Sequence, residues 1–108
     1  MKSGDIILIP FPYAELTDVK VRPAVVVSLT KDKYKDIIVC AISSVIPPSM
    51  GINDIPINPD TKNNLRVDSI IKVDRIVTLK KEDKINDLGK LSIEHYQKFK
   101  EVFKSLMD

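Results

Sequence analysis

The chain has 108 residues, of which 44% are hydrophobic and 30% are charged. This composition excludes a disordered protein, and the length gives room for one domain over residues 1–108. The net charge of +2 excludes a polycationic nucleic-acid-binding arm. No apolar run approaches the roughly 18 residues that span a membrane, and no secretory signal is visible. We therefore expect a cytoplasmic protein without membrane contact.

One cysteine and one histidine exclude a recognisable zinc site, so we expect no metal and no cofactor. Cys40 lies in an apolar run and is expected to be a buried small hydrophobic residue. His95 falls in the first turn of a predicted helix, where a solvated or capping histidine is far more common than a catalytic one.

The first part of the chain predicts two short strands joined by a long loop. Residues 5–9 predict a strand that Pro10 and Pro12 end, because proline cannot donate to a ladder. Residues 10–21 then form the loop, and residues 22–29 predict the second strand.

Three further runs predict strands in the middle of the chain. The near-continuous apolar run over residues 36–43 is typical of a strand buried on both faces or at the centre of a barrel. Residues 54–58 alternate polar and apolar side chains, and Pro56 indicates an edge strand. Residues 68–79 predict the longest strand, and residues 87–91 read as a short connector.

The last segment predicts a helix. Ser92 is a suitable N-cap, and an acidic residue in the first turn interacts favourably with the positive end of the helix dipole. An apolar stripe at three- and four-residue spacing comprises Ile93, Tyr96, Phe99, Phe103 and Leu106. Five or six strands followed by one C-terminal helix predict a mainly β fold with a strongly bent sheet or a partly open barrel.

Several polar residues are candidates for chemistry at strand ends. Arg22 follows a loop and opens a strand, which suits a guanidinium that binds phosphate, although a surface arginine is an equally good interpretation. Ser43 and Ser44 end the buried strand, where a hydroxyl can donate to a phosphate or a developing oxyanion. A serine that satisfies its own turn is the commoner case.

The strand over residues 68–79 carries a second group. Lys72 and Asp74 are two residues apart and should point to the same face, as general acid–base chemistry requires. An ordinary solvent-facing strand looks the same. Arg75 should point to the opposite face and be a surface residue.

Five segments in order resemble the MazF/PemK-type toxins, small endoribonucleases of type II toxin–antitoxin systems. These segments are Gly4-Asp5-Ile6, Arg22-Pro23-Ala24-Val25-Val26, Ala41-Ile42-Ser43-Ser44, residues 68–79 and Leu88-Gly89-Lys90-Leu91-Ser92. The resemblance implies a small SH3-like, strongly bent barrel with a C-terminal helix, the fold shared with CcdB, and usually a homodimer. It also implies metal-independent, sequence-selective cleavage of single-stranded RNA by its own 2′-hydroxyl, which leaves a 2′,3′-cyclic phosphate.

The resemblance assigns catalytic roles to four residues. Arg22 matches the arginine of the Arg-Pro motif and would stabilise phosphate charge or act as an acid. Ser43 falls where many members have threonine, and Asp74 matches an acidic residue that some members use as a base. Lys72 falls where those members have arginine, so the charge is kept but the bidentate fork is lost.

We also expect RNA contacts from the loop after the first strand and from the end of the buried strand. These residues are Tyr13, Glu15, Lys20 and Ser44. The loop departs from the Ser-Glu-Gln-x-Gly pattern of many members and contains no glycine.

The expected partners are a single-stranded RNA substrate, a cognate antitoxin and a second copy of the chain, with DNA contacted only through an antitoxin complex. One alternative is a non-catalytic toxin of the same fold that binds a protein target such as DNA gyrase. Another is a passive SH3-like module, which the scarcity of aromatic residues disfavours.

Overall fold

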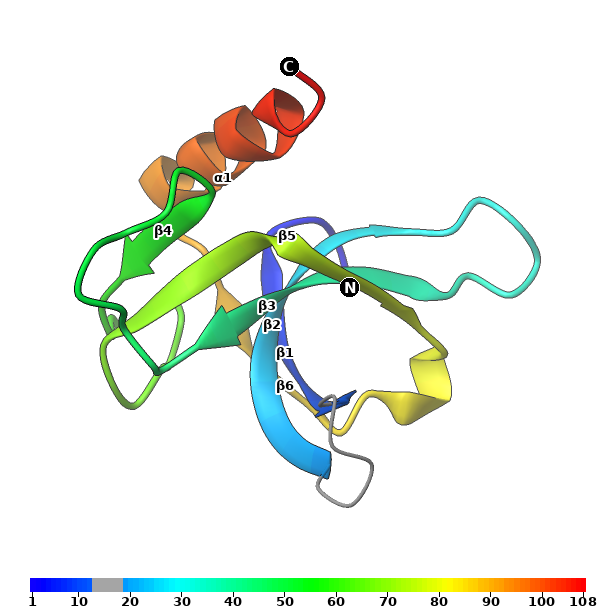
Figure 1. The fold of residues 1–108 in the computed structure, drawn as a ribbon. Coiled ribbons are helices and arrows are strands. Elements are labelled where there is room, and N and C mark those ends of the chain that lie inside the picture. Colours follow the sequence, from blue (N-terminus) through cyan, green and yellow to red (C-terminus); the bar gives the residue numbers. More distant parts are fainter. Residues whose placement is uncertain (13–18) are drawn as a thin grey trace.

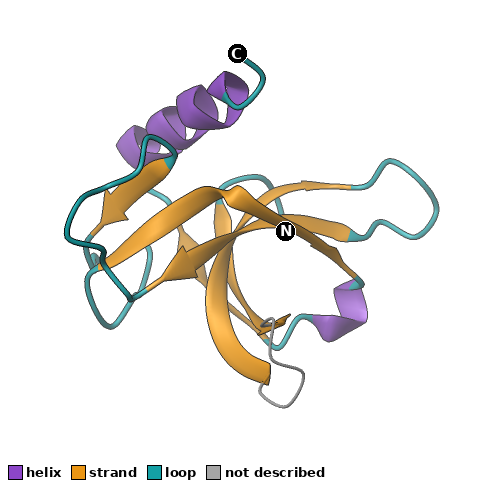
Figure 2. Ribbon diagram, viewed as in Figure 1, coloured by secondary structure: helices purple, strands orange, loops and turns teal. Residues whose placement is uncertain are grey.

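The computed structural model describes residues 1–12 and 19–108, and these form one sheet followed by a helix (Figure 1). The elements are β1 (Asp5–Pro12), β2 (Val19–Leu29), β3 (Ile37–Ser43), β4 (Asp54–Ile57), β5 (Ser69–Leu79), the short 3-10 helix η1 (Lys81–Asp83), β6 (Asn86–Lys90) and α1 (Ile93–Ser105). The sheet order is β4-β5-β3-β2-β1-β6. Figure 2 shows the strands curling into a partly open barrel with α1 beside one end. The predicted mainly β fold with a strongly bent sheet and a C-terminal helix is confirmed.

The first strand does not end before its prolines, so the predicted loop boundaries are wrong. Pro10 and Pro12 both belong to β1 and pair with β2. Antiparallel pairs alternate between hydrogen-bonded and non-hydrogen-bonded positions, so two residues that are two apart occupy the same kind of position. Because proline has no N–H group, the non-hydrogen-bonded position suits both prolines. The pairing of β1 with β6 stops at Leu8, and the missing N–H groups can therefore face an open edge without loss of a ladder bond.

The core extends over both faces of the central strands, as the apolar run in β3 predicted. One cluster includes Ile6, Val25, Cys40 and Ile71 and is covered by α1 through Phe99 and Val102. The second cluster, on the other face, includes Ile7, Ile9, Ala24, Val26, Ile37 and Val39. Neighbouring residues of one strand thus belong to different clusters, which fixes the register because a one-residue slip would exchange the two faces.

A large bulge interrupts β5 halfway along its length. Ala41 of β3 pairs with Lys72, whereas the adjacent Cys40 pairs with Ile76, so residues 73–75 have no partner of their own in β3. Such an insertion bends the strand and changes which side chains share a face. Figure 1 shows the resulting bend in β5.

Residues 86–90 form a strand, not the predicted connector. β6 pairs with the first half of β1, and the loop between β4 and β5 packs on its outer side. The N–H of Lys90 donates to the carbonyl of Lys62 at 3.0 Å, and the Asn64 amide donates to the carbonyl of Leu88 at 2.7 Å. At Gly89, a Cβ atom would lie 2.2 Å from the Lys62 carbonyl oxygen, so only glycine allows this approach.

The predicted N-cap of the helix is confirmed, and its apolar stripe needs two corrections. The Ser92 hydroxyl accepts a hydrogen bond from the backbone N–H of His95 at 3.2 Å. Ile93 is 75% exposed, whereas Val102 is buried in the core although the stripe omitted it. No helix among the described residues has the length and apolar character needed to cross a membrane.

Candidate functional site

A cavity of about 220 Å³ opens where β2, β3 and β5 lie side by side. We call it the first cavity. Its lining comprises Phe11, Arg22, Ala41, Ile42, Ser43, Val45, Lys72 and Arg75. Three of these side chains are cations and one is a hydroxyl, on an otherwise apolar surface. An anion is the ligand that this combination favours.

Arg22 occupies the centre of the candidate site. It pairs with Ile9 of β1 in the sheet, so its backbone is held within the ladder. Its side chain is half-buried and its Nε atom is buried. Arg22 lines both the first cavity and a larger neighbouring one. A guanidinium placed on a rigid strand between two cavities can hold an anion in a fixed orientation.

Ser43 presents its hydroxyl at the end of β3. The Oγ atom accepts a hydrogen bond from the backbone N–H of Val45 at 3.1 Å. This bond uses an oxygen lone pair, so the hydroxyl hydrogen is available to donate into the cavity. Ser43 therefore stabilises its own turn through the oxygen and can still donate its hydroxyl hydrogen to a ligand in the cavity.

Lys72 is oriented by an ion pair across the β4–β5 ladder. Its Nζ atom lies 3.5 Å from Oδ1 of Asp54, which is its partner in the register. The other oxygen of Asp54 accepts the backbone N–H of Gly51 at 2.9 Å. A partly exposed pair of this length contributes little to stability, about 0–1 kcal/mol, but it restricts where the ammonium group can lie.

The bulge in β5 brings Arg75 into the first cavity and leaves Asp74 outside it. Arg75 was predicted to be a surface residue on the face opposite to Lys72. It is exposed, as predicted, but it lines the same cavity as Lys72, because residues 73–75 do not follow the regular alternation of a strand. Asp74 is exposed and lines neither cavity. A regular strand would have placed Lys72 and Asp74 together.

Cys40 lies behind this region, in the core. Its thiol donates to the carbonyl of Val73 at 3.2 Å and thus satisfies a group within the bulge. Burial, reinforced by the negative charge of Asp74, raises the pKa of the Cys40 thiol to about 12. The expectation that Cys40 is a buried small hydrophobic residue is confirmed by its complete burial.

A second cavity of about 510 Å³ adjoins the first and shares Arg22 and Ile42 with it. Cationic side chains of Lys20 and Arg66 stand at this second cavity together with Ser44. Its apolar lining includes Leu8, Leu65, Val67 and Leu88. An apolar surface beside cations suits a planar base attached to a phosphate.

The structure brings most of the predicted residues to these two cavities. Arg22, Ser43 and Lys72 meet in the first, and Lys20 and Ser44 in the second. Tyr13 and Glu15 lie outside the described residues.

Sequence reasoning missed Arg75 and Arg66. For Arg75 a signal existed, because the apolar residues Val73 and Ile76 are three apart and so break the two-residue period of a strand. Arg66 stands in a loop without a motif, and nothing in the sequence places that loop beside Arg22. Within the described ranges, no group of three or more His, Cys, Asp or Glu side chains is arranged to hold a metal ion.

Comparison with known proteins agrees with this architecture. Among solved structures, an endoribonuclease in complex with its cognate antitoxin, from a mycobacterial species, superposes with a TM-score of 0.76 at 14% identity, covering 99% of this chain and 94% of that one. The toxin MazF-mt6 of Mycobacterium tuberculosis gives 0.70 at 16% identity, covering 96% of each chain. At these identities the likeness concerns the fold. No match was found among the curated proteins.

The sequence profile of one family spans nearly the whole chain. It is described as the PemK-like, MazF-like toxin of type II toxin–antitoxin systems, and it matches residues 2–107. That range includes every strand, the C-terminal helix and all the residues that line the two cavities. The chain therefore belongs to the PemK-like, MazF-like family of toxins of type II toxin–antitoxin systems.

Proposed function

We propose that this toxin is a metal-independent, sequence-selective endoribonuclease that cleaves single-stranded RNA. The observation that carries the proposal is the first cavity, which Arg22, Lys72 and Arg75 line together with Ser43. A phosphodiester flanked by a 2′-hydroxyl contains its own nucleophile. The protein then needs to supply only charge stabilisation, orientation and proton transfer.

The reaction forms one bond to phosphorus and breaks another. The 2′-oxygen attacks the adjacent phosphorus and loses its proton, and the bond to the 5′-oxygen breaks as that oxygen gains a proton. The products are a 2′,3′-cyclic phosphate and a 5′-hydroxyl. DNA lacks the 2′-hydroxyl and should resist.

Arg22 is the residue that we expect to bind the reacting phosphate. Negative charge accumulates on the non-bridging oxygens as the 2′-oxygen adds, and a guanidinium fork can donate two hydrogen bonds to them. Arg22 can also protonate the leaving 5′-oxygen. Its position on the sheet supports this role, since the backbone of a paired strand moves little.

Ser43 and the two other cations complete the proposed phosphate site. The Ser43 hydroxyl would donate to a phosphate oxygen, while Lys72 and Arg75 balance the charge. Arg75 supplies the bidentate fork that Lys72 lacks. The loss of the arginine at position 72 is thus offset within the same cavity by a neighbour from the bulge.

Asp74 as the base that removes the 2′-proton stays a prediction. Its exposed position outside the cavity lining means that the substrate would have to extend to the rim of the site for Asp74 to reach it. Replacement by Asn tests this role, because the amide keeps the size but cannot accept the proton. Unchanged cleavage by Asp74→Asn would assign the base elsewhere.

The second cavity is the proposed site for the nucleotide beside the scissile phosphate. Lys20 and Ser44 line this cavity, and the predicted RNA contacts of Tyr13 and Glu15 remain predictions.

A cognate antitoxin is the proposed protein partner, and the chain is proposed to work as a homodimer. The solved mycobacterial neighbour, an endoribonuclease bound to its antitoxin, supports the first of these partners.

The test is cleavage of a long, mixed-sequence single-stranded RNA in the presence of EDTA. We expect discrete fragments with cyclic phosphate ends from the wild type. Arg22→Ala should slow cleavage by about 10²- to 10³-fold, the usual cost of removing one donor from a developing oxyanion. Lys98→Ala, a cation lost from the exposed face of α1, serves as the matched control and should cleave normally.

The outcomes separate the two proposed kinds of toxin. Intact RNA at high protein concentration would contradict the ribonuclease, and inhibition of DNA gyrase would then be measured as the alternative. Cleavage by Arg22→Ala at the wild-type rate would remove the central assignment. Thermal unfolding of each variant shows whether a lost activity reflects a lost fold.

A further inference from the structure

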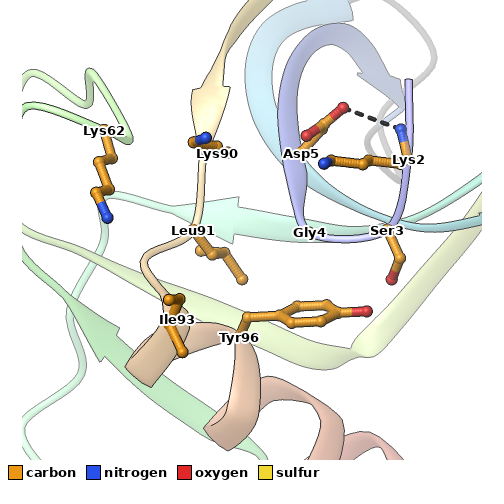
Figure 3. A pocket seen from close by; sticks show the side chains of 9 residues that line it. All are labelled: Lys2, Ser3, Gly4, Asp5, Lys62, Lys90, Leu91, Ile93 and Tyr96. Atoms are coloured by element: carbon orange, nitrogen blue, oxygen red, sulfur yellow. Dashed lines mark hydrogen bonds between the residues drawn. The ribbon is translucent and has the colours of Figure 1, made fainter.

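The two cavities of the candidate site continue into further hollows along β6. The second cavity shares Leu88 with a third one of about 420 Å³. The third shares Lys62 and Lys90 with a fourth one of about 480 Å³, which reaches the start of α1 (Figure 3). A line of four hollows, each sharing at least one lining residue with the next, thus extends from Arg22 to the N-terminal end of the helix.

Basic side chains accompany this line beyond Arg22. Arg66 stands in the second cavity, Lys62 and Lys90 in the third and fourth, and Lys2 in the fourth. Figure 3 shows the three lysines coming from separate segments around one hollow. Within the part of the chain that the structure describes, none of the three lysines forms an ion pair.

Two carboxylates also face the line, and both are engaged by the protein. Asp5 accepts the backbone N–H of Lys2 at 2.9 Å. Asp87 pairs with the ammonium of Lys84 at 3.0 Å, outside the hollows. Lys84 balances the charge of Asp87, whereas Asp5 keeps its negative charge and offsets one of the three lysines. The third and fourth cavities together therefore keep a net positive charge, which favours an anionic ligand.

The support beneath Lys62 is fixed by hydrogen bonds. The neighbouring Asn63 is fully buried, and its amide oxygen accepts the backbone N–H groups of Asp60 at 3.0 Å and Leu65 at 2.9 Å. The carbonyl of Lys62 itself accepts from Lys90. The backbones at Lys62 and Lys90 are thus held at a fixed separation, from which both side chains extend.

We propose that Lys62, Lys90 and Lys2 form a basic track that binds the phosphate backbone of the RNA strand after it leaves the Arg22 site. The inference rests on the proposed function and adds the course of the substrate over the surface. RNA is favoured over an acidic peptide because the third cavity, which Lys62 and Lys90 line, borders the second cavity at Leu88. The second cavity is the proposed site of the nucleotide beside the scissile phosphate.

The chemistry of the track indicates contact without base recognition. Lysine ammonium groups act as point charges and suit phosphates, whereas base edges are usually read by planar donors. The one aromatic ring at the track, Tyr96, packs against Gly4, where a Cβ would lie 2.9 Å from the ring. Its ring is thereby occupied within the fold, so stacking of a base is not part of the proposal.

The test compares short and long RNA in a binding assay. Fluorescence anisotropy is measured with 2′-O-methyl oligonucleotides, whose nucleophile is blocked, at lengths of about four and about sixteen nucleotides. The double variant Lys62→Ala/Lys90→Ala is compared with the wild type. Lys98→Ala/Lys104→Ala, which removes the same charge from the exposed face of α1, is the control.

The expected result is a loss confined to long RNA. Each phosphate contact on a single strand contributes about 0.7 to the slope of log Kd against log salt, so the double variant should lower that slope by about 1.4. At 0.1 M salt this corresponds to about 25-fold weaker binding of the long strand. The short oligonucleotide and the control variant should bind as the wild type does.

Other results would overturn the track. If long RNA binds the double variant and the control equally well while the wild type still cleaves RNA, the track is wrong and the proposed function stands. If the double variant instead loses only the binding of polyglutamate, the surface serves an acidic protein segment. If the wild type neither binds nor cleaves RNA, the proposed function fails and the track fails with it.

Discussion

Substitution of Gly89 by alanine should separate the β4–β5 loop from β6. The added Cβ would lie 2.2 Å from the Lys62 carbonyl oxygen and 2.8 Å from that of Asn63. Both neighbours are backbone atoms, so no side chain can rotate away, and the loop must retreat by about 1 Å to reach ordinary contact. Two hydrogen bonds between the loop and β6 would be strained or lost.

The magnitude follows from these two effects. Overpacking of a well-packed site costs about 1–3 kcal/mol, and each lost hydrogen bond costs about 1 kcal/mol. We expect Gly89→Ala to lower the free energy of unfolding by about 3 kcal/mol. In a domain of this size that corresponds to a fall in Tm of about 10 °C or more.

Urea denaturation followed by circular dichroism measures this change directly. Gly51→Ala is the matched control, because its nearest atom is a carboxylate oxygen of Asp54 at 3.1 Å, and a side chain can adjust. We expect the control to change stability by less than about 1 kcal/mol. If both alanine variants unfold at the wild-type urea concentration with unchanged m-values, the close contact between the loop and β6 does not exist in solution.

Three further predictions concern local interactions. Ser92→Ala removes the N-cap of α1 and should cost about 1 kcal/mol in urea unfolding, whereas Ser92→Gly should cost only a few tenths; equal effects would contradict the cap. Asn63→Ala leaves the partners of three hydrogen bonds of 2.9–3.0 Å unsatisfied and should cost about 3 kcal/mol, and a loss below 1 kcal/mol would show that water replaces the amide. The Cys40 thiol, with its pKa raised from 9.0 to about 12, should resist Ellman's reagent at pH 8 in the native state and react once the chain is unfolded. Because the pKa of this thiol is higher in the folded than in the unfolded chain, the contribution of the protonated thiol to stability is complete below pH 9 and is lost between pH 9 and 12. The free energy of unfolding should fall with a slope of up to about 1.4 kcal/mol per pH unit over that range. Cys40→Ala should lack this fall.

The strands that sequence analysis located well are those whose own side chains dictate them. The apolar run of β3 and the first half of β5 are buried in the core, and the helix carries both a cap and an apolar stripe. β6 was missed because Asn86-Asp87-Leu88-Gly89-Lys90 has almost no intrinsic preference for a strand. Its conformation depends on pairing with β1, which is a property of the tertiary structure.

The residues of the candidate site also differ in whether the local sequence or the tertiary structure determines their position. Ser43 could be found because it ends a strand that the sequence defines. Arg22 could be found because it opens the predicted strand, although β2 in fact begins three residues earlier, at Val19. Arg75 could not be placed by counting alternate positions, since the bulge in β5 adds residues that the partner strand does not match. Arg66 reaches the second cavity only because the β4–β5 loop packs against β6, a contact between segments far apart in the chain.

The prolines at the sheet edges limit how another protein can bind this toxin. Pro56 lies in the edge strand β4, and Pro10 and Pro12 lie in the half of β1 that β6 does not cover. Each lacks the N–H group that an added strand would need. The outer side of β6 is already used by the β4–β5 loop. Strand addition to the sheet is therefore blocked along these stretches, and any protein that binds there must be recognised through side chains.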